Sequence, residues 1–170
     1  FWFSFAPSIF LSLIDLSFLP LLAISLSIPL IRTGNKHNYM FLGILLLLFF
    51  GNLHIHLASA GLIKGDARVT IYAMILVIMS IISIISSRII PSFTVAGLRI
   101  HGQNLYQTAQ VKTDVLAMLL LLLLAISTLF SGLTSSVTGF CALAAGFIHL
   151  WRMRFWHTLK TAKEPLLWIL

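Results

Sequence analysis

Three polar side chains lie inside a long apolar segment, a setting in which a polar group is unfavourable and often functional. They are Asn52, His54 and His56, in the segment of about Tyr39–Ile63. Positions two apart on a helix differ in direction by about 200°, so the two histidines should not face the same pocket. Asn52, His56 and Ser59 share one helical face through their i+4 and i+3 spacing. We expect that face to point into a helix bundle.

Imidazole groups at this depth could serve one of two purposes. His54 lies nine residues before Ile63, or about 13 Å along a helix that rises 1.5 Å per residue, which is too far for an easy path to water. A neutral imidazole there could ligate haem iron or copper, or relay protons. It could equally form a hydrogen bond to a neighbouring helix and only hold the bundle together. The shared face favours His56 over His54 as a metal ligand.

Arg88 stands near the end of another apolar segment, about Val69–Ile90. Pro91 disfavours helical geometry at the residue before it, so we expect the helix to stop at Ile90. Arg88 would then lie in the last turn, where the helix dipole favours a cation. A guanidinium group there suits a carboxylate such as a haem propionate, or a lipid phosphate. The alternative is an arginine that only extends its side chain to the membrane surface.

The remaining candidate residues carry no recognisable chemistry. The single cysteine, Cys141, excludes an intrachain disulfide and a cysteine-based metal cluster. Asp15 and Asp114 fall near predicted helix ends, and His149 falls in a belt of aromatic and basic residues typical of a membrane interface. No catalytic triad, phosphate-binding glycine loop or HExxH motif is present. The sequence therefore predicts residues that could contact a bound cofactor, and it predicts no self-contained active site.

The composition requires an apolar environment. Hydrophobic residues make up 59% of the chain and charged residues 9%, against roughly 25% charged residues in ordinary soluble domains. Only helices and closed barrels satisfy their own backbone polar groups in lipid. Barrel strands alternate apolar and polar residues, whereas Phe41–Phe50 and Val115–Ile126 are almost continuously apolar. We therefore predict an all-α, polytopic transmembrane helix bundle.

Hydropathy predicts five complete spans and part of a sixth. The spans are about Ser8–Ile31, Tyr39–Ile63, Val69–Ile90, Asp114–Ser131 and Ser135–Trp151, and the sixth begins at Pro165–Leu170. The chain opens at Phe1 inside an apolar segment, and its last six residues fall short of the roughly 20 that a span needs. We therefore expect residues 1–170 to be part of one transmembrane domain, truncated at both ends.

Basic residues are distributed unevenly over the predicted loops. By the positive-inside rule, the face with more Lys and Arg is cytoplasmic, which places the loops near Lys36, Gly102 and Lys160 in the cytoplasm. This orientation accounts for the net charge of +7 without a nucleic-acid partner. The odd-numbered loops hold Arg32, Lys36, Arg99, Lys112, Arg152, Arg154, Lys160 and Lys163, and the even-numbered loops hold only Lys64 and Arg68.

Four segments carry a resemblance to a known family. They are Asp15-Leu16-Ser17-Phe18-Leu19-Pro20, then Asn38 leading to Asn52-Leu53-His54-Ile55-His56-Leu57, then Arg88-Ile89-Ile90-Pro91-Ser92-Phe93-Thr94, and Pro165-Leu166-Leu167-Trp168-Ile169-Leu170. In order and spacing they resemble the middle of the NnrS proteins, bacterial multi-pass membrane proteins described as containing haem and copper. The arginine-to-threonine signature is the most specific of the four, and the resemblance covers nearly all of Asp15–Leu170.

The chain departs from the family pattern at several positions. Ser86 and Ser87 replace a usual pair of glycines before the arginine, and His37 replaces an arginine before Asn38. The asparagine and histidine of the family's second-span motif match Asn52 and His56, whereas His54 falls on a variable position. The resemblance thus implies cofactor contacts at Asn52, His56 and Arg88, with His56 the metal ligand before His54. Other histidine-bearing segments of the family, and with them further ligands, are expected outside these residues.

The resemblance implies a haem–copper protein of the bacterial inner membrane that acts in the response to nitric oxide and nitrosative stress, in association with denitrification. Its expected partners are the lipid bilayer, haem or copper, and nitric oxide, and we do not predict an enzyme. The alternative is a transporter or a proton-relay subunit of a respiratory complex, in which Asn52, His56 and Arg88 would line a pathway. A membrane scaffold without a ligand is a third possibility.

Overall fold

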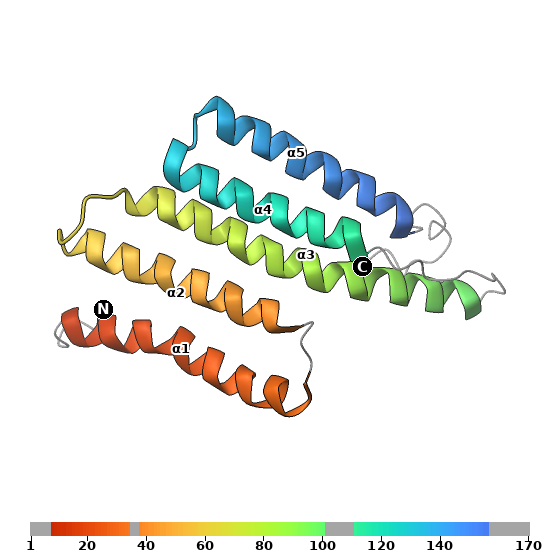
Figure 1. Cartoon of the computed structure of the whole chain (residues 1–170), viewed down its shortest axis with the longest axis horizontal. Coiled ribbons are helices and arrows are strands. Elements are labelled where there is room, and N and C mark those ends of the chain that lie inside the picture. The colour runs from red at the N-terminus through yellow and green to blue at the C-terminus, as the bar shows by residue number, and fades with distance from the viewer. Residues whose placement is uncertain (1–7, 35–37, 101–110, 157–170) are drawn as a thin grey trace. The chain divides into compact units, whose positions relative to one another are not determined.

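The computed structural model describes residues 8–34, 38–100 and 111–156. Within these ranges every regular element is a helix, which confirms the all-α prediction (Figure 1). Side chains in continuous apolar runs can satisfy no backbone group, so each segment closes its own hydrogen bonds as a helix. The elements are α1 (Ser8–Arg32), α2 (Tyr39–Ser59), α3 (Ala67–Ile100), α4 (Val111–Ser131), α5 (Ser136–Met153) and the short 3-10 helix η2 (Arg154–Trp156).

Four of these helices, α1 to α4, are long and apolar enough to cross a membrane. Large apolar side chains cover their outer surfaces, with Phe18 63% and Phe130 87% exposed. Helix α5 has 18 residues, includes His149 and Arg152, and is not among the four. A membrane protein is thus supported by four spans, and the predicted fifth remains a prediction. The predicted sixth, Pro165–Leu170, lies outside the described residues.

A glycine in the left-handed conformation ends α2 earlier than the predicted Ile63. The helix stops at Ser59, and Gly61 follows with φ of 72°. The N–H groups of Gly61 and Leu62 donate to carbonyls of the last turn, which is the paired bonding of a Schellman C-cap. The apolar run continues past Ser59, so the span predicted from hydropathy was too long. The polar residues of α2 consequently lie nearer to the helix end than predicted.

Pro91 does not end α3 at Ile90, and that prediction is wrong: α3 continues as one helix through the proline. A proline inside a helix removes one N–H and crowds the carbonyl four residues earlier, at a cost of about 3 kcal/mol. In an apolar surrounding, ending the helix would instead expose several unpaired backbone groups, each costing several kcal/mol. Helix α1 likewise continues through Pro20 and Pro29. The prediction considered only the restriction that proline imposes on the neighbouring backbone. It did not consider the apolar surroundings of the helix.

The chain divides into two compact units, Phe1–Val77 and Ile78–Leu170. In the first unit, α1 and α2 lie side by side and run antiparallel, and the start of α3 belongs to the same unit. In the second unit, α4 packs along α5, beside the rest of α3. The expectation of a single membrane domain for residues 1–170 remains a prediction.

Small side chains bring the helices of the second unit close together. Ser80, Ser83, Ser87 and Thr94 form a buried stripe along α3, and Ala117 of α4 is fully buried. Small residues allow helix backbones to approach closely in lipid, where no hydrophobic effect drives helices together. The Ser87 hydroxyl donates to a carbonyl of its own helix, which satisfies a polar group that water cannot reach.

Candidate functional site

Asp15, Asn52 and His56 form a polar cluster between α1 and α2. The Asn52 side-chain amide donates to Asp15 Oδ2 over 2.7 Å, and His56 Nε2 lies 2.9 Å from the same oxygen. The carboxylate remains 59% exposed and the imidazole 28% exposed. Asn52 and His56 are thus brought together on one face, and that face meets α1.

The carboxylate determines which imidazole nitrogen is open. An ionised carboxylate can only accept hydrogen bonds, so His56 donates from Nε2 and its lone pair lies on Nδ1. Metal-binding histidines usually donate their other ring N–H to a carboxylate, which fixes the ring and increases its basicity. Asp15 therefore orients His56 as such a partner would. Asp15 could have been suspected from the sequence, because it opens the first of the four family-like segments.

His54 lies on the other side of α2 and contacts the start of α3. Its Nδ1 is 2.9 Å from the Thr70 hydroxyl, and its ring packs against Gly65, where an added Cβ would lie 2.6 Å from Cε1. The ring thus joins the end of α2 to the loop and helix that follow. Since α2 ends at Ser59, His54 lies only about 7.5 Å from the helix end at 1.5 Å per residue. The predicted depth was too large.

The described residues fit a metal centre only in part. Among them, no three His, Cys, Asp or Glu side chains come close enough together to hold an ion. The cluster offers one oriented imidazole, through Nδ1 of His56, beside an amide and a carboxylate. That set can supply a single contact to a haem or copper group, and it cannot complete a copper site.

Arg88 is an exposed residue in the second unit and does not lie in the last turn of its helix. Because α3 runs on to Ile100, Arg88 is about 18 Å from the helix C-terminus at 1.5 Å per residue. Its predicted stabilisation by the helix dipole is therefore wrong, since that effect falls off within the last turn. Arg88 lies within electrostatic range of Asp114 at the start of α4.

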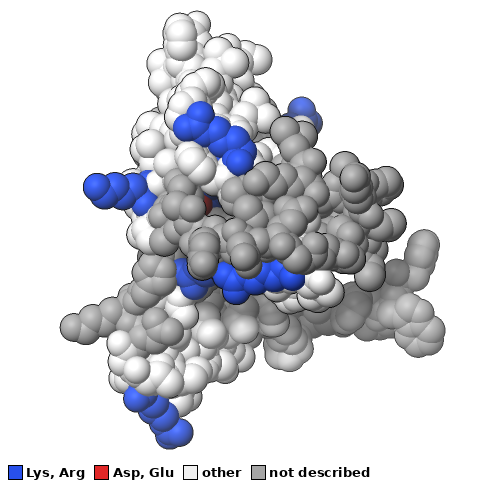
Figure 2. All heavy atoms as spheres, turned by 90° about the vertical axis from the view of Figure 1, so that its right-hand side faces the viewer, with Lys and Arg blue, Asp and Glu red and all other residues white. Residues whose placement is uncertain are grey.

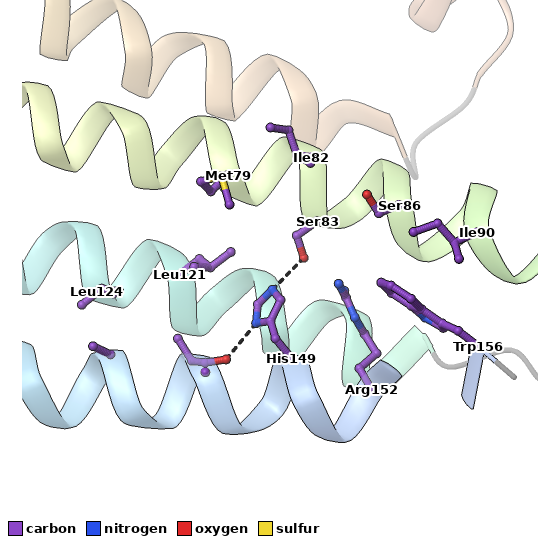
Figure 3. A pocket seen from close by; sticks show the side chains of 13 residues that line it. Met79, Ile82, Ser83, Ser86, Ile90, Leu121, Leu124, His149, Arg152 and Trp156 are labelled. Atoms are coloured by element: carbon purple, nitrogen blue, oxygen red, sulfur yellow. Dashed lines mark hydrogen bonds between the residues drawn. The ribbon is translucent and has the colours of Figure 1, made fainter. Parts of the chain in front are cut away.

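His149 was assigned to an interfacial belt, but the structure gives it defined partners (Figure 3). Its Nδ1 is 2.8 Å from the Ala145 carbonyl, and its Nε2 is 3.0 Å from the Ser83 hydroxyl. A carbonyl only accepts, so Nδ1 carries a proton, and Nε2 is hydrogen-bonded to the Ser83 hydroxyl. This bond joins α5 to α3. Nothing in the sequence relates two residues that lie so far apart along the chain.

Arg152 and Asp114 form an ion pair between α5 and α4. The Arg152 side chain is only 2% exposed, and its Nη1 lies 3.4 Å from Asp114 Oδ1. The sequence predicted Arg152 to lie in a basic loop, because the hydropathy of the predicted span ended at Trp151. The helix continues to Met153 instead, which brings the guanidinium group back between the helices.

Comparison with known proteins gave one family. The family model described as NnrS protein matches residues 1–170, the whole chain. A search of curated proteins and a search of solved structures each found no match.

Proposed function

Because the chain belongs to the NnrS family, we propose that it forms part of a haem- and copper-containing protein of the bacterial inner membrane that acts in the response to nitric oxide and nitrosative stress, in association with denitrification. The cluster of Asp15, Asn52 and His56 carries this proposal. It presents an imidazole whose Nε2 is held by a carboxylate at 2.9 Å, which leaves Nδ1 for a metal. When bound, the haem or copper would supply the metal at which a diatomic gas can coordinate.

Each residue of the cluster has a separate task in this proposal. His56 contacts the cofactor, Asp15 orients the ring, and Asn52 donates to the carboxylate and keeps it in place. Arg88 is retained as a predicted contact to a propionate or another anion, because a planar guanidinium group suits a carboxylate. The remaining ligands would have to come from residues other than those described.

The direct test is the cofactor content of the intact protein, purified from membranes in mild detergent. We expect a Soret absorption band with iron or copper bound in stoichiometric amount, and we expect cells lacking the protein to grow more slowly under nitric oxide. A colourless, metal-free preparation from haem- and copper-replete cells would contradict the proposal.

A proton-relay subunit is the second candidate, and the contact between His56 and Asp15 favours it specifically. Histidine and carboxylate side chains inside membrane helices form proton relays in pumps and transporters. A metal-free protein that acidifies or alkalinises proteoliposomes, and loses this activity when Asp15 is replaced by asparagine, would support the relay. This experiment therefore decides whether the cluster binds a cofactor or relays protons.

The predicted orientation gives a further test. Figure 2 shows several exposed Lys and Arg side chains among the described residues. The positive-inside rule would place the loops that carry most of the basic residues in the cytoplasm. Reporter fusions after Lys36, at Gly102 and after Lys160, which lie outside the described residues, should report the cytoplasm. A fusion at Gly65 should report the outside, and the same side for Gly65 and Gly102 would contradict the helix count.

A further inference from the structure

Arg152 is a buried guanidinium group whose hydrogen-bonding capacity is only partly used. Its side chain is 2% exposed, yet its Nε is buried and has no hydrogen-bond partner in the described part of the chain. A buried charge needs both a counter-charge and filled donor positions to offset its loss of hydration. An Arg152 with an open Nε therefore indicates a further acceptor that belongs beside it.

Asp114 supplies less than one full counter-charge. It meets Arg152 through a single nitrogen at 3.4 Å, whereas a paired arginine and carboxylate often share two shorter bonds. The same carboxylate also lies near the Ser87 hydroxyl and attracts Arg88. One carboxylate thus faces two guanidinium groups. Because Arg152 shares this carboxylate, a further anion beside it would be favourable.

The guanidinium group lines one end of a mainly apolar cavity between α3, α4 and α5 (Figure 3). The cavity has a volume of about 390 Å³, within the range of roughly 300–1,000 Å³ typical of ligand pockets. Met79, Ile82, Leu121 and Leu124 form much of its wall. His149 also lines it, but both of its ring nitrogens already have hydrogen-bond partners. Arg152 is therefore a charged group of the lining with capacity left for a ligand.

Residues around the end of α5 have the character of a membrane interface. The guanidinium carbon of Arg154 lies 3.1 Å from the centre of the Trp151 ring, and that of Arg152 lies 5.2 Å from the Trp156 ring. Tryptophan and arginine side chains gather at the level of lipid headgroups. We therefore expect the charged end of the cavity to lie at the level of lipid headgroups and its apolar wall to lie deeper in the membrane.

We propose that this cavity binds one anionic phospholipid, with the phosphate at Arg152 and an acyl chain along the apolar wall. Basic pockets between membrane helices bind acidic headgroups in this way. A phosphate oxygen would fill the open Nε and add the counter-charge that Asp114 only partly gives. The apolar wall distinguishes a lipid from inorganic phosphate, which would leave that wall without a partner.

The test compares lipid retention by native mass spectrometry of the intact protein, purified with phosphatidylglycerol or with phosphatidylcholine. The wild-type protein should retain one phosphatidylglycerol and no phosphatidylcholine. Arg152→Gln should weaken retention about tenfold or more, because a charge-assisted hydrogen bond contributes a factor of this size. Arg154→Gln, which removes an exposed charge from the same helix end, should retain the lipid.

A second pair of variants tests the acyl chain and leaves the ion pair intact, so it remains informative if Arg152→Gln does not fold. Gly146 lines the cavity, and an added Cβ there would meet nothing within 4 Å. Gly146→Leu should therefore fill the cavity and weaken lipid retention about tenfold, by displacing several buried methylene groups of the acyl chain. Gly139→Leu is the matched control, since Gly139 is equally open but does not line the cavity.

Two results would overturn the proposal. Equal lipid retention by Gly146→Leu and Gly139→Leu would mean that no acyl chain occupies the cavity. Displacement of phosphatidylglycerol by inorganic phosphate, with phosphate binding unchanged in Gly146→Leu, would assign Arg152 to a small anion and exclude a lipid.

Discussion

Replacing His56 with alanine should remove most of the bound haem or copper from the intact protein and weaken the protection of cells against nitric oxide. The physical reason is the loss of an imidazole whose ring is held by Asp15 at 2.9 Å. Loss of one interhelical hydrogen bond costs only about 0.6 kcal/mol on average, so the variant should still insert and fold. Metal content per protein, measured at equal membrane expression, is the readout.

His54→Ala is the internal control for this experiment. His54 lies two residues away on the same helix but packs against Thr70 and Gly65, so its loss should leave the metal content almost unchanged. Asp15→Asn should give an intermediate result and lower metal affinity about 10- to 100-fold, as partners that orient a metal ligand typically do. Normal metal content in a well-expressed His56→Ala protein would assign His56 to packing alone.

Replacing Asp114 with asparagine should destabilise the second unit by about 3–5 kcal/mol, the usual result of leaving a buried charge without its partner. Arg152 is 2% exposed, so the variant leaves a largely buried guanidinium group without its carboxylate partner. The measurement is the thermal unfolding of the purified protein in a zwitterionic detergent free of anionic lipid. Asp114→Asn should unfold at a markedly lower temperature than the wild-type protein.

A double variant distinguishes the effect of removing the whole ion pair from the effect of removing one of its partners. Asp114→Asn combined with Arg152→Met removes both charges, and an apolar replacement of a buried ion pair is often neutral or stabilising. We therefore expect the double variant to recover most of the lost stability. Arg154→Met, at an exposed position two residues away, should have little effect. A shift for Asp114→Asn as small as that for Arg154→Met would show that Arg152 does not depend on this carboxylate.

The sequence predicted helices well where hydropathy and a local stop signal agree. Helix α4 ends at the predicted Ser131 because Gly132 follows with φ of 81°. The prediction from the sequence failed where local backbone preferences and the apolar surroundings favour different structures. Pro91 is the example, because it interrupts neither α3 nor its apolar run. The positions of the helices along the chain were therefore predictable. Whether a helix continues through a single unfavourable residue in apolar surroundings was not.

Contacts between helices could be predicted only in part. The shared face of Asn52 and His56 followed from helical spacing, but their partner Asp15 did not. Helix α1 is apolar around most of its circumference, so periodicity gives no indication of which side meets α2. The bond between Ser83 and His149 is a similar case, since it depends on how α3 and α5 pack. Tertiary packing selects such pairs from many possible ones.

The short connection between α4 and α5 has a consequence for biogenesis. Only four residues, including left-handed Gly132, separate Ser131 from Ser136. Helix α5 carries a buried arginine near its end, and translocon scales assign such a residue a penalty of about 2.5–3.5 kcal/mol at the centre of a span, and less toward its ends. Helix α4 brings both an apolar surface and the carboxylate that offsets this charge. We therefore expect the two helices to leave the translocon as a hairpin, with α4 acting as the insertion partner of α5.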